Sequence, residues 1–221
     1  MAGRFSKEQL KNKLQRSTFS LVASGGIESV TVRKVANGCG LSDPYIYQCY
    51  SDMTDLMTDA FLRIDREIAS LIATVIKKQT QEKESDIEEN CWRLWSTYWK
   101  FLLDDPEKIV FYWRFYQSGY YSMEILEQRR ENFQVFTSFI YTTGDHMGVN
   151  DHRSLDAAVS CIIDDTVSVA VKIHQGYLNE NDIPAQAIYG SAFSYLLQMV
   201  KIDVWERLHQ KEKYKNRGSK I

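Results

Sequence analysis

The sequence has few of the residues that interrupt regular structure. Of its 221 residues only 3 are proline and 11 are glycine. Sandwiches and barrels need many tight turns, which these residues favour, so their scarcity argues against an all-β fold. The hydrophobic fraction of 44% and the charged fraction of 25% are ordinary for a globular chain. One larger domain, or a small domain on a larger one, fits this length.

Signals of several other protein classes are also missing. No apolar run reaches the roughly 18–20 residues of a membrane span, and the first residues, MAGRFSKEQL, lack the apolar stretch of a signal peptide. The four cysteines form no CxxC pair, and no HExxH, GxSxG, GxGxxG or phosphate-binding loop occurs. We therefore expect a reduced, cytoplasmic protein that has no membrane span, metal or cofactor and is not an enzyme.

The formal net charge of −2 conceals an uneven distribution. Residues 1–50 carry seven bases and three acids, a net of +4, and residues 207–221 carry a net of +5. The segment between them carries −11. A basic N-terminal segment on an acidic body is expected when only that segment meets phosphate.

Helix start signals recur along the chain and predict an all-α protein of about nine helices. Capping residues precede five of the apolar periodic segments: Ser6, Thr31, Ser42, Ser85 and Asp105. Two further helices are expected to start at Ser51-Asp52, with acids in the first turn, and at Ser122. Ser42 is expected to cap a short helix from Asp43 to about Tyr50. A single helix is expected from Ser122 to about Tyr141, with a loop from Gly144 to Asp151.

Residues 31–56 read TVRKVANGCGLSDPYIYQCYSDMTDL, two short helices joined by a glycine turn. This arrangement is typical of a helix-turn-helix. The second helix would be anchored by Ile46 and Tyr50 and would present its outer side chains to the major groove of DNA.

This stretch resembles the helix-turn-helix of the TetR family of bacterial transcription regulators. The matching residues are Thr31-Val32-Arg33, Val35-Ala36, Gly40-Leu41-Ser42, Ile46-Tyr47, Tyr50 and Asp55-Leu56. The resemblance is confined to roughly residues 6–60. It implies a homodimer with a DNA-binding domain over residues 1–51, a helical effector-binding and dimerisation domain over residues 52–210, and, after it, a flexible basic tail over residues 211–221.

The resemblance also implies roles for single residues. Thr31, Ser42 and Tyr47 would contact phosphates, while Tyr45 and Gln48 would face base edges. A primary amide such as that of Gln48 pairs bidentately with adenine. The alternative for each of these residues is a solvated helix surface.

Three further positions bear on DNA binding. Arg33 would reach a phosphate or a base. The family commonly has lysine where this sequence has Asp43 and Met53, and each lost phosphate contact makes the salt dependence shallower by roughly 0.9. Asp43 could instead accept a hydrogen bond from a cytosine amino group. The resemblance as a whole implies a repressor that a small-molecule effector releases from operator DNA. The alternative, which Asp43 and Met53 suggest, is a co-regulator with weakened or lost DNA binding that acts through a protein partner.

Aromatic side chains recur at helical spacing in the body. The candidate effector-pocket residues are Trp92, Trp95, Trp99, Trp113, Tyr116, Tyr120 and Asp165. Two interpretations stay open: a pocket for an aromatic or cationic small molecule, or an aromatic core. Asp165 either pairs with Lys172 or lies at a solvated edge, or it faces the pocket.

Small residues mark the expected dimer interface. Ala157, Ala158 and Cys161 on one helix, and Ala185, Ala187, Gly190 and Ser191 on the next, permit close approach. Two such helix pairs would form a four-helix interface in a symmetric dimer.

Overall fold

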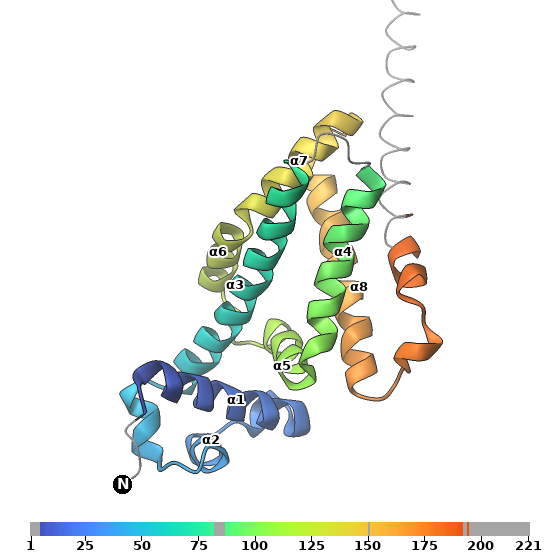
Figure 1. The fold of residues 1–221 in the computed structure, drawn as a ribbon. Helices are drawn as coiled ribbons and strands as arrows, with labels where there is room; N and C mark the ends of the chain where they lie inside the picture. Colours follow the sequence, from blue (N-terminus) through green and yellow to red (C-terminus); the bar gives the residue numbers. More distant parts are fainter. Residues whose placement is uncertain (1–4, 82–86, 150, 192–193, 195–221) are drawn as a thin grey trace, which may run out of the picture.

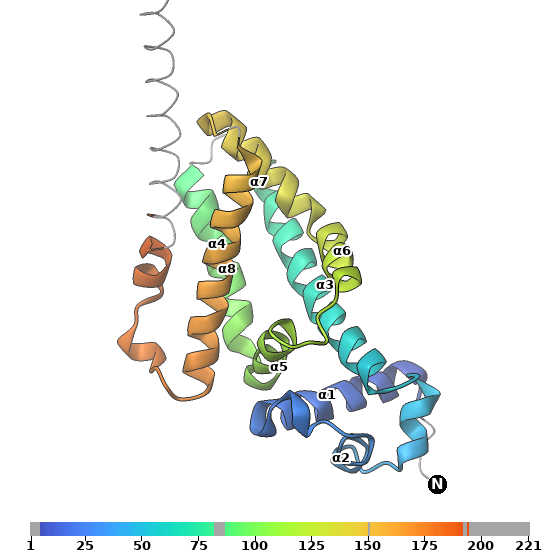
Figure 2. The ribbon, with the colours of Figure 1, turned by 180° about the vertical axis from the view of Figure 1, so that it is seen from behind.

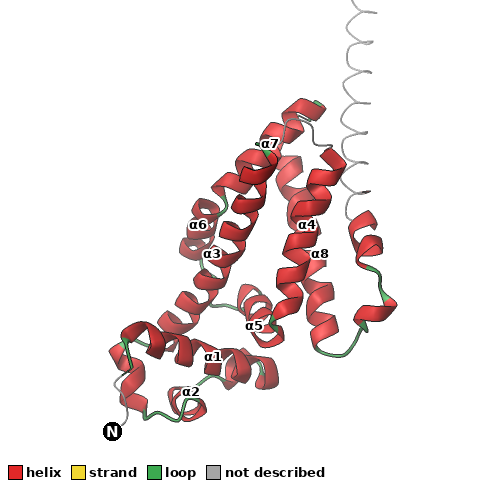
Figure 3. Ribbon diagram, viewed as in Figure 1, coloured by secondary structure: helices red, strands yellow, loops and turns green. Residues whose placement is uncertain are grey.

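The computed structural model describes residues 5–81, 87–149, 151–191 and 194. These residues form helices and loops, with no strand among them, which confirms the all-α prediction (Figure 3). The α-helices are α1 (Lys7–Gly25), α2 (Val32–Gly38), α3 (Met53–Gln79), α4 (Ile87–Asp104), α5 (Pro106–Tyr116), α6 (Met123–Asn132), α7 (Gln134–Met147) and α8 (His152–His174). Three 3₁₀-helices, η1 (Ile27–Ser29), η2 (Asp43–Gln48) and η3 (Glu180–Asp182), accompany them, and residues 185–191 are again helical.

The helices form a small group and a larger one (Figure 1). α1, α2 and η2 make up the small group, which we call the head, and α3–α8 make up the body. α3 starts beside the head and runs the length of the body, while α5 lies across the base of the body and packs on α1. Seen from behind, α8 packs along α4 on one side, and α6 and α7 follow α3 on the other (Figure 2).

Most helices begin where a side chain can satisfy free backbone N–H groups. Ser6 and Gln9 form a reciprocal capping box at α1, with hydrogen bonds of 3.2 and 2.9 Å. At α2, α3 and α5 the side chains of Thr31, Asp52 and Asp105 each accept one hydrogen bond from the backbone N–H three residues further on. These local signals explain why helix starts were predictable.

The short helix expected after Ser42 is present as the 3₁₀-helix η2, but it ends at Gln48, and the Ser42 side chain does not cap it. The second residue of η2 is Pro44, which has no N–H to offer. The next N–H, that of Tyr45, donates to the Ser42 carbonyl at 3.0 Å. The Tyr45 N–H is therefore already bonded to the backbone, and the Ser42 hydroxyl does not receive it.

The single helix expected from Ser122 to Tyr141 is wrong, because the chain breaks at Phe133 into α6 and α7. Phe133 has φ −93° and ψ 12°, outside helical geometry. The break directly follows Asn132, whose side chain is bound to Asp65 of α3. The expected loop from Gly144 is also wrong, because α7 continues to Met147 and ends at Gly148, whose φ of 84° favours glycine.

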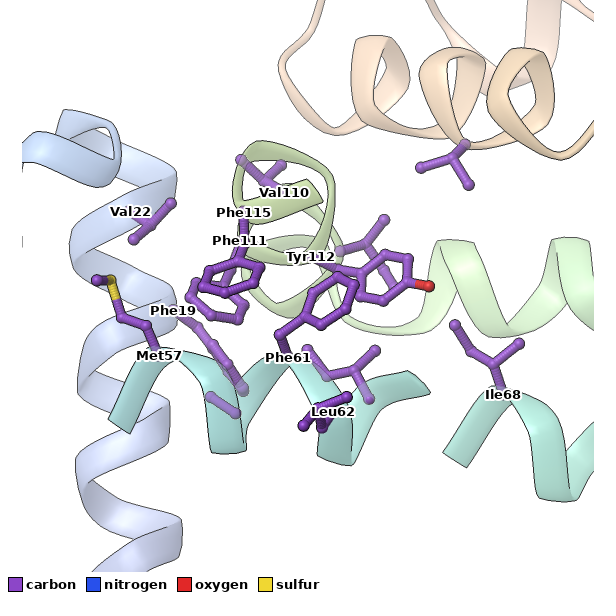
Figure 4. Packing of buried hydrophobic residues seen from close by; sticks show 14 of the residues in the cluster. Phe19, Val22, Met57, Phe61, Leu62, Ile68, Val110, Phe111, Tyr112 and Phe115 are labelled. Atoms are coloured by element: carbon purple, nitrogen blue, oxygen red, sulfur yellow. The ribbon is translucent and has the colours of Figure 1, made fainter. Parts of the chain in front are cut away.

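Aromatic rings fill the junction of α1, α3 and α5 (Figure 4). The ring of Phe61 is fully buried, and its centroid lies 4.8 Å from those of Tyr112 and Phe115. Phe19 of α1 meets Phe111 of α5 at 4.9 Å. The head is therefore joined to the body by a continuous apolar core as well as by α3.

We expect Phe61→Ala to lower the free energy of unfolding by about 3–5 kcal/mol, because it removes a fully buried ring and leaves a cavity. Urea denaturation followed by circular dichroism measures this. Met123→Ala is the matched control, since Met123 is 67% exposed, and should change stability by less than about 0.5 kcal/mol. Equal losses in the two variants would contradict this account of the core.

Candidate DNA-binding surface and effector cavity

The head has the geometry of a helix-turn-helix. At Gly38 the last turn of α2 approaches α1 so closely that a Cβ would lie 2.2 Å from the Ser17 hydroxyl oxygen. Gly40 then turns the chain with a φ of 66°. Val35 of α2 and Ile46 of η2 are fully buried against this frame. The opposite sides of α2 and η2 face outward.

Every residue predicted to contact DNA is exposed: Thr31, Arg33, Ser42, Asp43, Tyr45, Tyr47 and Gln48. Of the tyrosines in this set, Tyr47 is more exposed than Tyr45, at 59% against 38%. Exposure of a large aromatic ring carries no packing benefit within this chain. It suits contact with DNA, and it also fits the alternative of a solvated surface.

Part of the positive charge of the head is used internally. Lys11 pairs with Asp59 of α3 at 2.9 Å, and Arg16 pairs with Asp105 at the start of α5. Within the described residues, exposed bases without an ion pair remain on the head at Lys7, Lys13, Arg33 and Lys34. The net of +4 over residues 1–50 therefore overstates what the head offers to phosphate.

Tyr50 lies just after η2, the second helix of the helix-turn-helix, and attaches it to α1 and α3. Its buried hydroxyl donates to Asp59 at 2.9 Å and accepts from the Gln15 amide at 3.0 Å. Burial and the nearby charge of Asp59 raise the pKa of Tyr50, so it remains a neutral donor. Partial burial opposes ionisation of Asp59, but hydrogen bonds from Lys11 and Tyr50 outweigh it and lower the pKa of Asp59.

In the body, a second polar network surrounds a fully buried carboxylate. Asp65 of α3 accepts hydrogen bonds from the Tyr112 hydroxyl at 3.0 Å, the Arg129 Nε at 2.8 Å and the Asn132 amide at 3.1 Å. Arg129 also donates to the hydroxyls of Tyr112 and Tyr121 at 3.1 and 3.2 Å. The network therefore ties α3 to α5 and α6.

Arg129 is held charged within aromatic surroundings. Its guanidinium carbon lies 5.2 Å from the ring centre of Tyr116 and 5.8 Å from that of Phe133. Burial opposes its charge, but the neighbouring Tyr112 and Asp65 outweigh burial and raise the pKa of Arg129. The guanidinium of Arg129 thus keeps its charge despite its burial.

A cavity of about 360 Å³ lies beside this network. Its wall is mainly apolar and aromatic and comes from α3, α4, α6, α7 and α8, with Ile68, Ile72, Leu94, Trp95, Tyr98, Leu126, Phe133, Phe136, Ile140, Val159, Ile162 and Ile163 among its residues. Tyr112 and Arg129 also line it. This volume, with its few polar groups, suits a small organic ligand.

Of the predicted pocket residues, the structure places Trp95 in the cavity wall. Trp92 and Trp99 lie on either side of Trp95 in the same stack, with ring centres 5.7 and 5.5 Å from it, and do not line the cavity. The tryptophan stripe of α4 thus contributes one residue to the cavity and two to the packing beside it.

The other predicted pocket residues lie elsewhere. Trp113 and Tyr116 pack against each other, and Tyr120 stacks on Phe115, all outside the cavity wall. Asp165 is exposed, which agrees with the solvated-edge alternative and not with a pocket role. A helix turns by about 100° per residue, and the preceding residue, Asp164, is the half-buried one.

Sequence reasoning missed the residues that organise the cavity. Asp65 and Arg129 lie among other charged residues of their helices, and nothing local pairs Asp65 with a base 64 positions away. A signal did exist at the start of α7, where Phe136 and Ile140 recur at helical spacing with Phe133, the residue before the helix.

Within the described part of the chain, no helix is long and apolar enough to cross a membrane. No group of three histidine, cysteine, aspartate or glutamate side chains there could hold a metal ion.

Comparison with known proteins identifies the fold. No protein-family model and no curated protein sequence matches this chain. Among solved structures, a TetR family transcription regulator from Marinobacter aquaeolei VT8 is 17% identical with a TM-score of 0.68, over 84% of this chain and 94% of that chain. A transcriptional regulator from Rhodococcus sp. Rha1 is 14% identical with a TM-score of 0.61, over 86% of this chain and 96% of that one.

The fatty acid degradation regulator of Bacillus halodurans is 13% identical with a TM-score of 0.60, and the match covers 90% of this chain and 96% of that chain. The chain therefore has the fold of the TetR-family transcription regulators, as the resemblance in residues 6–60 predicted. The likeness extends over the body as well as the head, since most of each chain is covered.

Asp65→Asn should lower the free energy of unfolding by about 3–5 kcal/mol, because it leaves the buried Arg129 without its charge partner. Thermal and guanidinium denaturation measure the loss. Glu89→Gln is the control, since Glu89 forms an exposed pair with Arg93 on α4, and its cost should stay below about 0.5 kcal/mol. A cost for Asp65→Asn as small as that of the control would contradict the described network.

The stability contributed by Asp59 should depend on pH. Its folded pKa is lowered, so its contribution is complete well above the unfolded pKa of about 4. It is lost as the pH falls through the folded pKa. We expect the difference in unfolding free energy between wild type and Asp59→Asn to be constant from pH 7 to about 5.5 and to shrink between about pH 5 and 3. Urea denaturation at each pH measures the difference, and a constant difference down to pH 3 would contradict the prediction.

Proposed function

We propose that this protein is a homodimeric DNA-binding transcription regulator, and that a small-molecule effector in the body releases it from operator DNA as a repressor is released. The proposal assigns residues 1–51 to DNA binding and residues 52–210 to effector binding and dimerisation. The proposed basic tail, residues 211–221, and most of the last predicted helix lie outside the described residues.

The observation that carries the proposal is the division of the helix-turn-helix into buried and exposed sides. Ile46 and Tyr50 are buried and hold η2 on α1 and α3, while Tyr45, Tyr47 and Gln48 project outward. This is what a segment needs if its side chains are to enter a major groove about 12 Å wide. Tyr47 would contact phosphate, and Gln48 would read a base.

The dimer interface would lie on α8 and the helix that follows it. Ala157 and Cys161 are exposed on α8, whereas Ala158 is buried within the body. The exposed small residues support close approach of a second copy. A symmetric dimer would place two heads on one face of DNA about 34 Å apart.

The route from effector to head would run through α3. Asp59 of α3 binds Tyr50 and Lys11 of the head. Asp65, six residues or about 9 Å further along the helix axis, binds Arg129 of the cavity wall. Ile68 and Ile72 then line the cavity directly. A ligand that displaces this part of α3 would shift the head with it.

α5 would provide a parallel route. Its Tyr112 lines the cavity and donates to Asp65, while the neighbouring Phe111 packs on Phe19 of the head. In Figure 4 the Tyr112 hydroxyl points away from Phe19 and toward the Ile68 end of α3. In the dimer, the distance between the two heads decides whether both can reach DNA. An effector changes the operator affinity only if it binds one such spacing more tightly than another.

The test is DNA binding by the purified protein. A preferred duplex is first selected from a random pool, and affinities are then measured by fluorescence anisotropy across a salt series. We expect Gln48→Ala to weaken binding to the selected sequence roughly 5- to 150-fold. Binding to unrelated DNA should not change, because Gln48 carries no charge. Met123→Ala, remote from the head, is the control.

A second variant tests Asp43, which stands where the TetR family commonly has lysine. Asp43→Lys should tighten binding to all sequences and steepen the salt dependence by about 0.9 for one added phosphate contact. If the wild-type protein enriches no sequence from the random pool and binds every duplex with the same weak affinity, the regulator proposal fails. The co-regulator that acts through a protein partner would then be the function to pursue.

A further inference from the structure

Tyr98 of α4 is a buried phenol without a hydrogen-bond partner. Its side chain lines the cavity and the residue is only 7% exposed. Among the described residues its hydroxyl makes no hydrogen bond, and its oxygen is not one of the fully buried side-chain atoms that lack a partner, so the oxygen is open to the cavity. A polar group at an apolar wall usually has a partner, and here a bound molecule would supply it.

The other polar groups deep in the cavity wall are already satisfied. Tyr112 donates to Asp65, Trp95 donates to the Thr166 hydroxyl at 3.2 Å, and Tyr189 donates to the Glu88 carbonyl at 3.2 Å. Thr137 is half-buried and Ser160 is exposed, so water can reach both. Tyr98 is therefore the buried donor that remains for a ligand.

The charges around the cavity favour an uncharged occupant in its interior. Two charged residues of the lining, Arg130 and Asp156, are exposed, so water reaches both, and Arg129 is the less exposed one. Arg129 is compensated by its bond to Asp65, so it offers no free charge to an anion. Its guanidinium already lies over the ring of Phe133, which lines the cavity, so that aromatic face is taken and is not open to a cationic ligand. Burial is the largest of the effects that raise the pKa of Tyr98, so the phenol stays a neutral donor.

We propose that Tyr98 is the hydrogen-bond anchor of the cavity, and that the cavity takes a neutral, mainly apolar molecule with one acceptor oxygen, such as a ketone or ester carbonyl. This inference deepens the proposed effector role of the cavity and rests on it. A carbonyl that accepts from Tyr98 would replace the bond that the phenol lacks, while the ligand body covers the apolar wall.

The experiment compares two probes of equal shape. 2-Acetylnaphthalene carries a carbonyl, and 2-isopropenylnaphthalene carries a CH₂ group in place of the oxygen. Isothermal titration calorimetry on the full-length wild-type protein should show the ketone binding about 3- to 10-fold more tightly than the alkene, as expected for one neutral hydrogen bond. Tyr98→Phe should abolish this preference by weakening the ketone alone.

Tyr189→Phe is the matched control, because Tyr189 also lines the cavity but its hydroxyl is bonded to a backbone carbonyl. It should keep the ketone preference. A preference that survives in Tyr98→Phe, or that is absent from the wild type, would overturn the anchor role. Tighter binding of 2-naphthoate or of trimethyl(2-naphthyl)ammonium than of the ketone would overturn the neutral class, and no binding of any of the four probes would overturn the cavity assignment.

These measurements need no DNA. If Tyr98-dependent ketone binding is found in a protein that selects no operator, the inference stands and the regulator proposal fails. If an operator is selected but the ketone preference does not depend on Tyr98, the regulator proposal stands and the inference fails.

Discussion

A carboxylate with no contact with solvent must be supplied with hydrogen-bond donors, and the body of this protein is arranged around that requirement. Asp65 lies midway along α3, and its three donors come from α5 and α6. An ionised group in such a place is stable only when every partner is present. The positions of α5 and α6 against α3 therefore depend on one side chain, and the break between α6 and α7 directly follows the last donor.

The same network has two neighbours with different requirements. On one side, Phe61 and Phe115 need dense aromatic packing to join the head to the body. On the other, Arg129 and Tyr112 form part of the wall of an open cavity. Interiors are close-packed and transmit small displacements instead of absorbing them. A molecule in the cavity would therefore act on α3 and α5 together, and both helices contact the head.

Local chemistry was predictable from the sequence, and distant chemistry was not. Ser6, Thr31, Asp52 and Asp105 mark helix starts because each acts on backbone groups within three residues. Nothing local indicates that Lys11 and Arg16 are paired with acids of α3 and α5, so the charge of the head was overestimated. Asp165 was a pocket candidate, yet it is exposed and the neighbouring Asp164 is half-buried. A periodic pattern without a fixed phase cannot resolve a rotation of one residue.

The stacked indoles of α4 have a consequence for how this protein can be observed. Trp92, Trp95 and Trp99 are three of its five tryptophans, and the ring planes of Trp95 and Trp99 are within 9° of parallel. Chromophores in such an array couple their electronic transitions, so we expect this array to contribute to the circular dichroism of the protein. Because Trp95 also lines the cavity, a molecule in the cavity would contact the middle ring of the array and so act on the protein's own optical reporter.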